Sequence, residues 1–553
     1  MDEPGPSSSS SFGYDATSRE AMYKNRGMTS DVMRKRREEA CAEIRKARRL
    51  DDLNKRRQID LAPPEIIEDP DYEPESNAQS CSAWSQVITM ADHEQPCTAM
   101  DERIIAKLYG ECTREIEESL DFYRRRFRTS NFSAAYFLNG NASDVADEIV
   151  ALNIIPRIVE LLHTGPSLNI RRTATHVIGA IVSICSTHTE AIVKSGVVPY
   201  LIDLIGNPDR ELRELTLFAL GNIAAECCEY RDLCIEYGMA QKMTMIPDGM
   251  TLMEARCAVW AASNLCRGKE PPVDLEKISV LLPLFNEALY SNDTLIISDA
   301  CRAFGRLLDA IPESSYKYIL KPSTVECLVE HMGNPNSKIS LAALLAVGNI
   351  VSGDDEQTQN VVCCTNALNN IHRLLLDGDQ KRSVKYAGYY RILLLACWVI
   401  ANAVTGGSKE HITRIVNEGA LTPLSDMLTV MDCSVVVVVL KTLAGILECG
   451  ESYKGGNVDD TFVNYIGNMG FLGKCSSDIN GKNPYSAMLE ELNVIDKLEF
   501  LMLSTNTEIF FKACAIMEKY YLCDDDEQDE AASKRNSDAI DSVGKAINHF
   551  NFS

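Results

Sequence analysis

A short motif that returns at a nearly constant interval constrains this fold more than any other feature. The motif is an apolar helical segment with a small residue, an asparagine and an aliphatic residue, as in LGNIAAE at 220–226 and VGNIVSGDD at 347–355. The asparagine position is occupied in turn by Ala180, Asn222, Asn264, Arg306, Asn349, Asn402 and Gly445, at steps of 42, 42, 42, 43, 53 and 43 residues. A period of this length is typical of stacked repeats rather than of separate globular domains.

A second marker keeps the same phase. Gly196 and Gly238 lie 42 residues apart, each before an apolar segment, and Gly419 repeats the pattern. Within a unit, the alternation of apolar segments and Gly or polar breaks indicates three consecutive helices. The sequence therefore predicts an all-α fold, a right-handed superhelical solenoid of about nine armadillo-like repeats, preceded by a basic arm.

Charge divides the chain into a basic arm and an acidic body. Residues 19–57 carry 14 Lys and Arg against 7 Asp and Glu, so the arm contributes +7 and the remainder −31 to the net charge of −24. An acidic body is a poor partner for phosphates but attracts cationic peptides. We therefore expect basic polypeptides as ligands and no direct contact with nucleic acid.

Several other classes of protein find no support in the sequence. Its longest apolar run, 392–404, is shorter than the roughly 18 residues that a membrane span requires. We expect most of the 20 cysteines, including the pairs Cys227–Cys228 and Cys363–Cys364, to be reduced core residues. The eight histidines show no metal-ligand spacing, and no phosphate-binding or nucleophile motif is present, so we assign no metal, no cofactor and no enzymatic activity.

Aromatic residues recur four positions before the repeated asparagines, so ring and amide share one helix face. The pairs are Phe218 with Asn222, Trp260 with Asn264, and Trp398 with Asn402. Amides can hydrogen-bond an extended peptide backbone, rings can hold the stems of Lys and Arg, and the carboxylates of Glu226, Asp354 and Asp355 can bind the cationic heads. The alternative is that these residues are packing devices, but two of the three tryptophans share one repeat position, which favours binding.

These segments resemble the importin α (karyopherin α) family. The likeness rests on VWAASNLCRGKEPP, AVGNIVSGDDEQTQ, ACWVIANAVTGGS, the C-terminal block NPYSAMLEELNVIDKLEFL and the basic N-terminal segment, and it covers nearly the whole chain. The resemblance implies an adaptor of nuclear protein import, present in cytoplasm and nucleus. It implies a major site for nuclear localisation signals at Thr189, Phe218, Asn222, Glu226, Trp260 and Asn264, and a minor site at Asn349, Thr358, Trp398 and Asn402.

The chain departs from the family pattern at several of these positions. His176 and Ala180 occupy the ring and amide positions before Phe218, and Leu345 precedes Asn349. The 53-residue step spans one repeat where the pattern has two, so the minor site lacks one unit. Between the sites, Arg302 and Arg306 should repel a cationic peptide. Binding of single basic clusters at the major site is therefore the safer expectation, and a scaffold with a mitotic or signalling role is the alternative.

The basic arm is similar to the importin-β-binding segment of the same family. The residues expected to bind importin-β, or to occupy the chain's own groove as an autoinhibitor, are Arg34, Lys35, Arg36, Arg37, Arg45, Lys46, Arg48, Arg49, Lys55, Arg56 and Arg57. The expected division is a disordered N-terminus at 1–18, the arm at 19–61, a linker at 62–111, the solenoid at 112–523 and an acidic tail at 524–553. The last repeat resembles the region where the family meets its nuclear export receptor.

Overall fold

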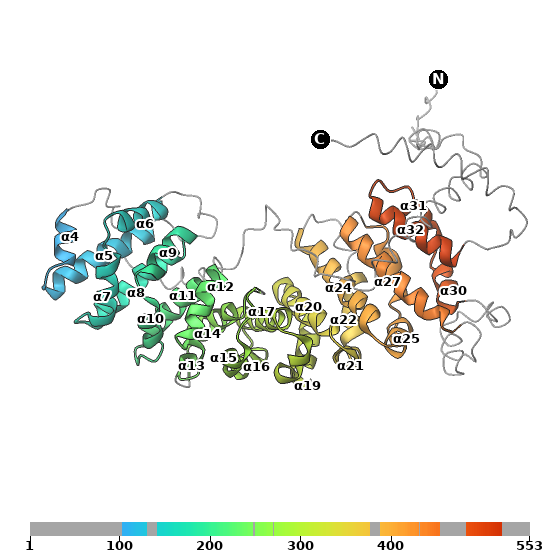
Figure 1. Cartoon of the computed structure of the whole chain (residues 1–553), viewed down its shortest axis with the longest axis horizontal. Helices are drawn as coiled ribbons and strands as arrows, with labels where there is room; N and C mark the ends of the chain where they lie inside the picture. The colour runs from blue at the N-terminus through green and yellow to red at the C-terminus, as the bar shows by residue number, and fades with distance from the viewer. Residues whose placement is uncertain are drawn as a thin grey trace, which may run out of the picture. The chain divides into compact units, whose positions relative to one another are not determined.

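The computed structural model describes residues 102–129, 141–246, 249–268, 270–376, 387–430, 432–453 and 483–521 (Figure 1). Within these ranges the regular structure is helical and contains no strand. The described residues fall into two compact units, one ending at Leu492 and one beginning at Asn493, and each is taken by itself. The predicted all-α armadillo fold is confirmed, whereas the count of nine repeats stays a prediction.

The larger unit is a stack of long helices, each of which packs against the next. The stack begins with α5 (Thr113–Thr129) and continues through α8 (Leu168–Val182), α11 (Arg210–Glu226), α14 (Leu252–Leu265), α17 (Thr294–Ala310), α20 (Ser337–Val351), α24 (Ala387–Gly406) and α27 (Cys433–Glu451). From α8 onward, each of these helices carries one copy of the repeated motif. The sequence period thus corresponds to one long helix per unit (Figure 1).

Shorter helices connect the members of the stack. They are α4 (Glu102–Leu108), α6 (Asn141–Ala151), α7 (Ile155–Thr164), α9 (Ser186–Lys194), α10 (Val198–Leu204), α12 (Cys228–Glu236), α13 (Met239–Met243), α15 (Leu275–Ile278), η1 (Ser279–Leu281), α16 (Leu282–Ala288), η2 (Glu313–Ser315), α18 (Tyr316–Ile319), α19 (Pro322–Met332), α21 (Asp355–Val362), α22 (Ala367–Leu376), α25 (Lys409–Asn417), α26 (Leu421–Met427) and α30 (Pro484–Glu491). The smaller unit contains α31 (Val494–Leu501) and α32 (Thr507–Tyr520), which pack together.

Polar N-caps fix the starts of the long helices at the repeat period. The capping residues are Ser167, Asp209, Thr251, Asp293, Asn336 and Asp432, and each side chain accepts a hydrogen bond from a backbone N–H in the first helical turn. The first five lie 42, 42, 42 and 43 residues apart. Because an N-cap satisfies an otherwise unpaired N–H, these side chains set where each long helix begins.

Several of these caps are also held from the preceding long helix. The bonds run from Ser167 Oγ to Glu117 Oε1 (2.6 Å), from Arg172 Nε to Asp209 Oδ1 (2.8 Å), from Thr251 Oγ1 to Glu214 Oε1 (2.9 Å) and from Arg256 Nε to Asp293 Oδ1 (3.1 Å). The same side chain therefore caps its own helix and ties it to its neighbour. The hydrogen bond from Arg172 lowers the pKa of Asp209, whereas burial raises the pKa of Glu214.

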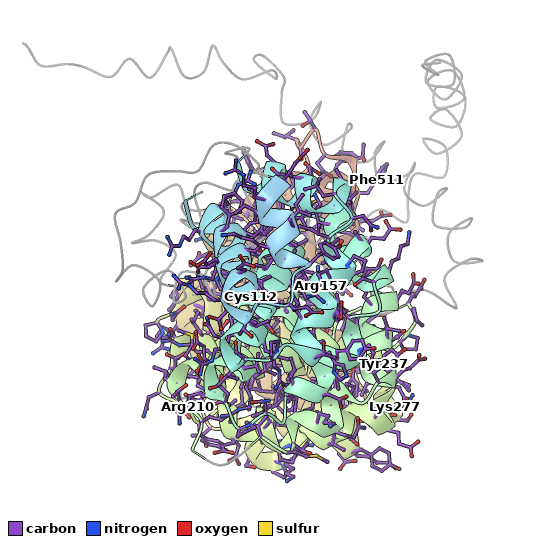
Figure 2. All side chains as sticks on the ribbon, turned by 90° about the vertical axis from the view of Figure 1, so that its left-hand side faces the viewer. Cys112, Arg157, Arg210, Tyr237, Lys277 and Phe511 are labelled. Carbon is purple, nitrogen blue, oxygen red and sulfur yellow. The ribbon has the colours of Figure 1, made fainter. Side chains whose placement is uncertain are left out.

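Arg157 makes a similar connection near the start of the larger unit. Its Nε donates to the carbonyl of Leu108 at 3.0 Å and its Nη2 to that of Gly110 at 3.3 Å. The guanidinium of this α7 residue thereby holds the turn between α4 and α5, close to which Cys112 lies (Figure 2).

One sequence expectation needs correction here. The paired cysteines are not core residues, because Cys227 and Cys363 are exposed and Cys228 and Cys364 half-buried. In addition, α27 is the one helix among the described residues that is long and apolar enough to cross a membrane. However, 61% of its apolar window is buried, and it packs against α24 and α30, as a core helix does.

Candidate functional site: the ring and amide ladder

The predicted site residues from the motif lie on successive long helices. We call the rings Phe218, Trp260 and Trp398 together with the amides Asn222, Asn264, Asn349 and Asn402 the ladder. Its members come from α11, α14, α20 and α24. Since α11 packs on α14 and α20 on α24, the ladder forms two groups with α17 between them.

A glycine on the preceding helix seats each tryptophan of the ladder. A Cβ atom at Gly221 would lie 2.2 Å from Cζ3 of Trp260, and one at Gly348 would lie 1.9 Å from Cζ3 of Trp398. Real Cβ contacts do not come this close, so only glycine leaves room for the indole. Both indoles are consequently buried, with 3% of Trp260 and 1% of Trp398 exposed.

The asparagines use one N–H to join consecutive helices. Asn264 Nδ2 donates to the carbonyl of Gly221 (3.2 Å), Asn349 Nδ2 to that of Gly305 (2.9 Å) and Asn402 Nδ2 to that of Gly348 (3.1 Å). The alternative interpretation, that these residues serve packing, is therefore partly correct, because Asn264, Asn349 and Asn402 hold consecutive long helices together. Each of these amides retains a second N–H beyond that bond.

Asn222 is bonded differently from the other ladder asparagines. Its Nδ2 donates to the carbonyl of Phe218 on its own helix at 3.2 Å, and its Oδ1 is buried without a hydrogen-bond partner among the described residues. An unpaired buried acceptor is costly, and such exceptions call for an explanation.

The residues assigned to the major site by resemblance come from three elements of the larger unit, α9, α11 and α14. The Phe218 and Trp260 rings stack with centroids 6.0 Å apart and planes at 24°, and Phe218 is the more exposed of the two. Glu226 is exposed at the end of α11. Thr189 is fully buried, and its Oγ1 lies 3.3 Å from the carbonyl of Val182, where α8 ends.

The residues assigned to the minor site repeat part of this arrangement. Thr358 is fully buried, and its Oγ1 lies 3.4 Å from the carbonyl of Val351, where α20 ends. Trp398 Nε1 is buried without a hydrogen-bond partner in the described part of the chain. Asp354 serves as the N-cap of α21 in a capping box with Gln357, so its carboxylate is already engaged.

Among the described residues, the 53-residue step adds no long helix between α20 and α24. Helix α24 packs directly on α20, and the bond from Asn402 to Gly348 takes the place that the bond from Asn264 to Gly221 has between α14 and α11. The two groups of the ladder are therefore separated by α17 alone among the long helices.

The arginines of α17 are partnered within the protein. Arg306 Nη1 donates to the carbonyl of Ser263 (2.8 Å) and to Asn264 Oδ1 (3.0 Å), so both polar atoms of the Asn264 amide are engaged. Burial, reinforced by the nearby positive charges of Arg302 and Arg267, lowers the pKa of Arg306. Arg302 Nη1 donates to Asp299 Oδ1 at 2.9 Å, and burial raises the pKa of Asp299.

The sequence analysis did not predict the glycines that make room for the tryptophans, nor the hydrogen bonds that join the N-caps to the preceding long helix. Both had a detectable signal, because the glycines stand directly before the asparagine position and the caps recur at the same period. The predicted arm residues, Arg34 to Arg57, lie outside the described residues. The part of the chain that the structure describes contains no group of His, Cys, Asp or Glu able to hold a metal ion.

Comparisons with known proteins agree with this architecture. Family models match for the importin beta binding domain at residues 19–112, an armadillo/beta-catenin-like repeat at 185–225 and an atypical Arm repeat at 483–534. Importin subunit alpha-1b of Oryza sativa subsp. japonica is 27% identical over 439 residues, covering 73% of this chain and 76% of the relative. Importin subunit alpha-4 of Arabidopsis thaliana is 28% identical over 563 residues, covering 92% of each chain.

Among solved structures, an engineered protein superimposes with a TM-score of 0.56 at 21% identity. The match covers 76% of this chain and 98% of the engineered one. At this identity the likeness supports the fold alone.

Proposed function

This chain is a member of the importin α family, and on that premise we propose that it binds basic nuclear localisation signals along its ladder and links them to importin-β through residues 19–61. The role of nuclear import adaptor has the support of the family models and of the relatives. The groove, its residues and the division into segments are our proposal. Such an adaptor moves between cytoplasm and nucleus.

One observation carries the proposal. The importin beta binding model matches residues 19–112, a range that includes the segment with a charge of +7, on a chain whose remainder has −31. A basic arm on an acidic solenoid is suited to two exchangeable partners, because the arm can bind either an acidic receptor or the chain's own acidic groove. The armadillo family is not one of enzymes, and we propose no catalytic activity.

Within the major site, the geometry favours Phe218 and Asn222 over Trp260 and Asn264 as the first contacts of a peptide. Phe218 exposes more of its ring than Trp260, which supports a role in contacting a lysine stem. Asn222 is 2% exposed and has an acceptor without a partner, which a peptide N–H would satisfy once the side chain turns toward the surface. Glu226, exposed on the same helix, supplies a carboxylate for a cationic head.

For the minor site we propose weaker or no binding. Trp398 and Asn402 are held as Trp260 and Asn264 are, but Leu345 stands where a second ring is expected and one unit of the family pattern is missing. A single basic cluster at the major site remains the proposed cargo signal. The C-terminal repeat, where the atypical Arm model matches, is the proposed contact with a nuclear export receptor.

The repeat positions that lack a ring or an amide also favour a second candidate, a scaffold that no longer carries import cargo. The ring and amide positions on α8 are His176 and Ala180, and Asn264 already bonds Gly221 and Arg306. Under this candidate the chain would retain importin-β binding but lose affinity for basic signals.

One experiment separates the two candidates. The full chain is mixed with importin-β, and a fluorescent lysine-rich peptide is titrated into the complex while its anisotropy is recorded. Saturable binding in the micromolar range or tighter supports the adaptor. Binding of importin-β with no measurable peptide affinity would favour the scaffold, and failure to bind either would reject both.

A further inference from the structure

A cysteine, a histidine and an aspartate from two neighbouring helices form a connected chain of polar contacts. Cys185 Sγ lies 3.0 Å from His188 Nδ1, and His188 Nε2 lies 2.9 Å from Asp147 Oδ1. Cys185 is the N-cap residue of α9, His188 stands in the first turn of that helix, and Asp147 comes from α6, which packs against α9. The ladder uses none of these three side chains.

We propose that Cys185 is a reactive thiol, activated by His188 and Asp147, that hydroperoxides oxidise to a sulfenic acid. Both contacts of the imidazole are satisfied when Nε2–H donates to Asp147 and Nδ1 accepts the thiol proton. Asp147 then holds the ring in position and stabilises the imidazolium that forms. Thr187 Oγ1, 3.0 Å from the sulfur, can donate a hydrogen bond to the resulting thiolate.

The exposure of the three groups fits this chemistry. Cys185 is exposed and reachable by a small oxidant, whereas His188 is 3% exposed and so is fixed in its orientation. Reactive cysteines combine access with a nearby proton acceptor and a helix N-terminus. By contrast, burial raises the pKa of Cys234 and Cys266 to about 12, which keeps those thiols protonated and unreactive.

The reaction balances with the peroxide as the only co-reactant. The Cys185 proton passes to His188 Nδ1, and the sulfur attacks the terminal oxygen of the hydroperoxide. An S–O bond forms as the O–O bond breaks, so that sulfur loses two electrons and the peroxide gains them. The departing oxygen takes the proton from the imidazolium and leaves as water or an alcohol.

The repeat itself provides a matched control. Cys227 lies 42 residues after Cys185, is the N-cap residue of α12 and is also exposed. Its backbone angles, φ −155° and ψ 166°, nearly equal those of Cys185, φ −159° and ψ 167°. Tyr230 stands where His188 does. Each thiol therefore lies at the N-terminus of a helix, but only Cys185 has an imidazole beside it.

The test compares the two thiols within one molecule. The full chain is treated with limiting iodoacetamide, and separately with hydrogen peroxide followed by dimedone, and each peptide is quantified by mass spectrometry. We expect Cys185 to be alkylated, and trapped as a sulfenic acid, about tenfold faster than Cys227. Equal rates for the two thiols would overturn the proposal.

Two variants identify the groups responsible. His188→Gln should bring the Cys185 rate down to that of Cys227, and Asp147→Asn, at an exposed carboxylate, should lower it severalfold. The buried thiols Cys234 and Cys266 in the same sample report whether the fold is intact, since unfolding would expose them to the reagent. If neither variant slows Cys185 while Cys227 is unchanged, the imidazole has no part in its reactivity and the proposal is wrong.

Discussion

The indole of Trp260 rests directly on Gly221 of the preceding helix, with no room for a side chain between them. The same helix pair is joined by the bond from Asn264 to the Gly221 carbonyl. A residue type that sequence reasoning assigned to ligand binding thus also forms the joint between repeats, and its substitution affects stability as well as affinity.

Gly221→Ala should destabilise the solenoid although alanine is the better helix former. The Cβ would collide with the buried indole, and overpacking of this kind costs about 1 to 3 kcal/mol, more than the ~1 kcal/mol that the helix gains. Urea unfolding followed by circular dichroism measures the change in midpoint. Gly206→Ala is the control, because no atom lies within 4 Å of its Cβ position. An unchanged midpoint for Gly221→Ala would show that the joint is looser than described.

Asn222→Ala and Asn264→Ala should separate binding from stability. Asn222 makes no bond to the preceding helix, so its loss should weaken binding of a lysine-rich peptide by about tenfold with little change in the unfolding midpoint. Asn264 is engaged by Gly221 and Arg306, so its loss should lower stability by roughly 1 kcal/mol and affect binding less. Anisotropy titrations and urea unfolding give the two readouts. The reverse order of affinities would restore Asn264 as the main contact.

Arg306→Gln should strengthen the binding of basic peptides. The substitution removes a half-buried positive charge beside the ladder while keeping an N–H donor for the Ser263 carbonyl. We expect affinity to rise roughly threefold to tenfold at low salt, with the gain shrinking as salt screens the charge. Arg114→Gln removes the same charge from an exposed position on α5 and should have no comparable effect. A weaker peptide complex with Arg306→Gln would mean that this arginine supports the groove instead.

Low pH should weaken the interactions of Asp209, which caps α11 and accepts a hydrogen bond from Arg172 of α8. The hydrogen bond from Arg172 lowers the pKa of Asp209 below its unfolded value, so its contribution is complete above the unfolded pKa of about 3.9 and is lost as the pH falls through the folded pKa. Asp209→Ala should therefore cost roughly 1 to 2 kcal/mol at pH 7 and progressively less toward pH 3. Urea unfolding at several pH values tests this, with Arg172→Gln as a variant that keeps the cap but removes its main source of acid sensitivity. A cost independent of pH would contradict the role of Arg172.

Removal of residues 1–70 should expose the groove. If the basic arm competes with cargo for the acidic body, the shortened chain should bind a lysine-rich peptide more tightly than the full chain, and salt should weaken both complexes steeply. Addition of importin-β to the full chain should reproduce the effect of the truncation. Equal affinities with and without the arm would reject autoinhibition.

Much of the architecture could be predicted from the sequence because it depends on periodicity. The interval between Asn222 and Asn264 predicted consecutive long helices, and the direct packing of α20 on α24 agrees with reading the 53-residue step as one unit. Burial and partner choice were not predictable. Nothing in the sequence says that Arg306 turns toward Asn264 rather than toward the proposed groove, because that choice depends on the desolvation and hydrogen bonds of the folded neighbours.

The cluster of Cys185, His188 and Asp147 was not predicted from the sequence for a related reason. His188 and Asp147 lie 41 residues apart and show no motif spacing. Only the packing of α6 against α9 brings them together. A search restricted to short-range patterns therefore finds the ladder, which follows the repeat, and overlooks a cluster that occurs once.

The joint between α20 and α24 bears on how such a chain tolerates changes in length. Asn402 and Gly348 are 54 residues apart, whereas Asn264 and Gly221 are 43 apart, yet the two pairs form the same bond. Eleven additional residues have therefore been accommodated without altering the contact surface. The same bond couples α14, α20 and α24 to the long helix before each of them. The length of chain between two such couplings can therefore change without altering either coupling, because each unit contacts only its neighbours.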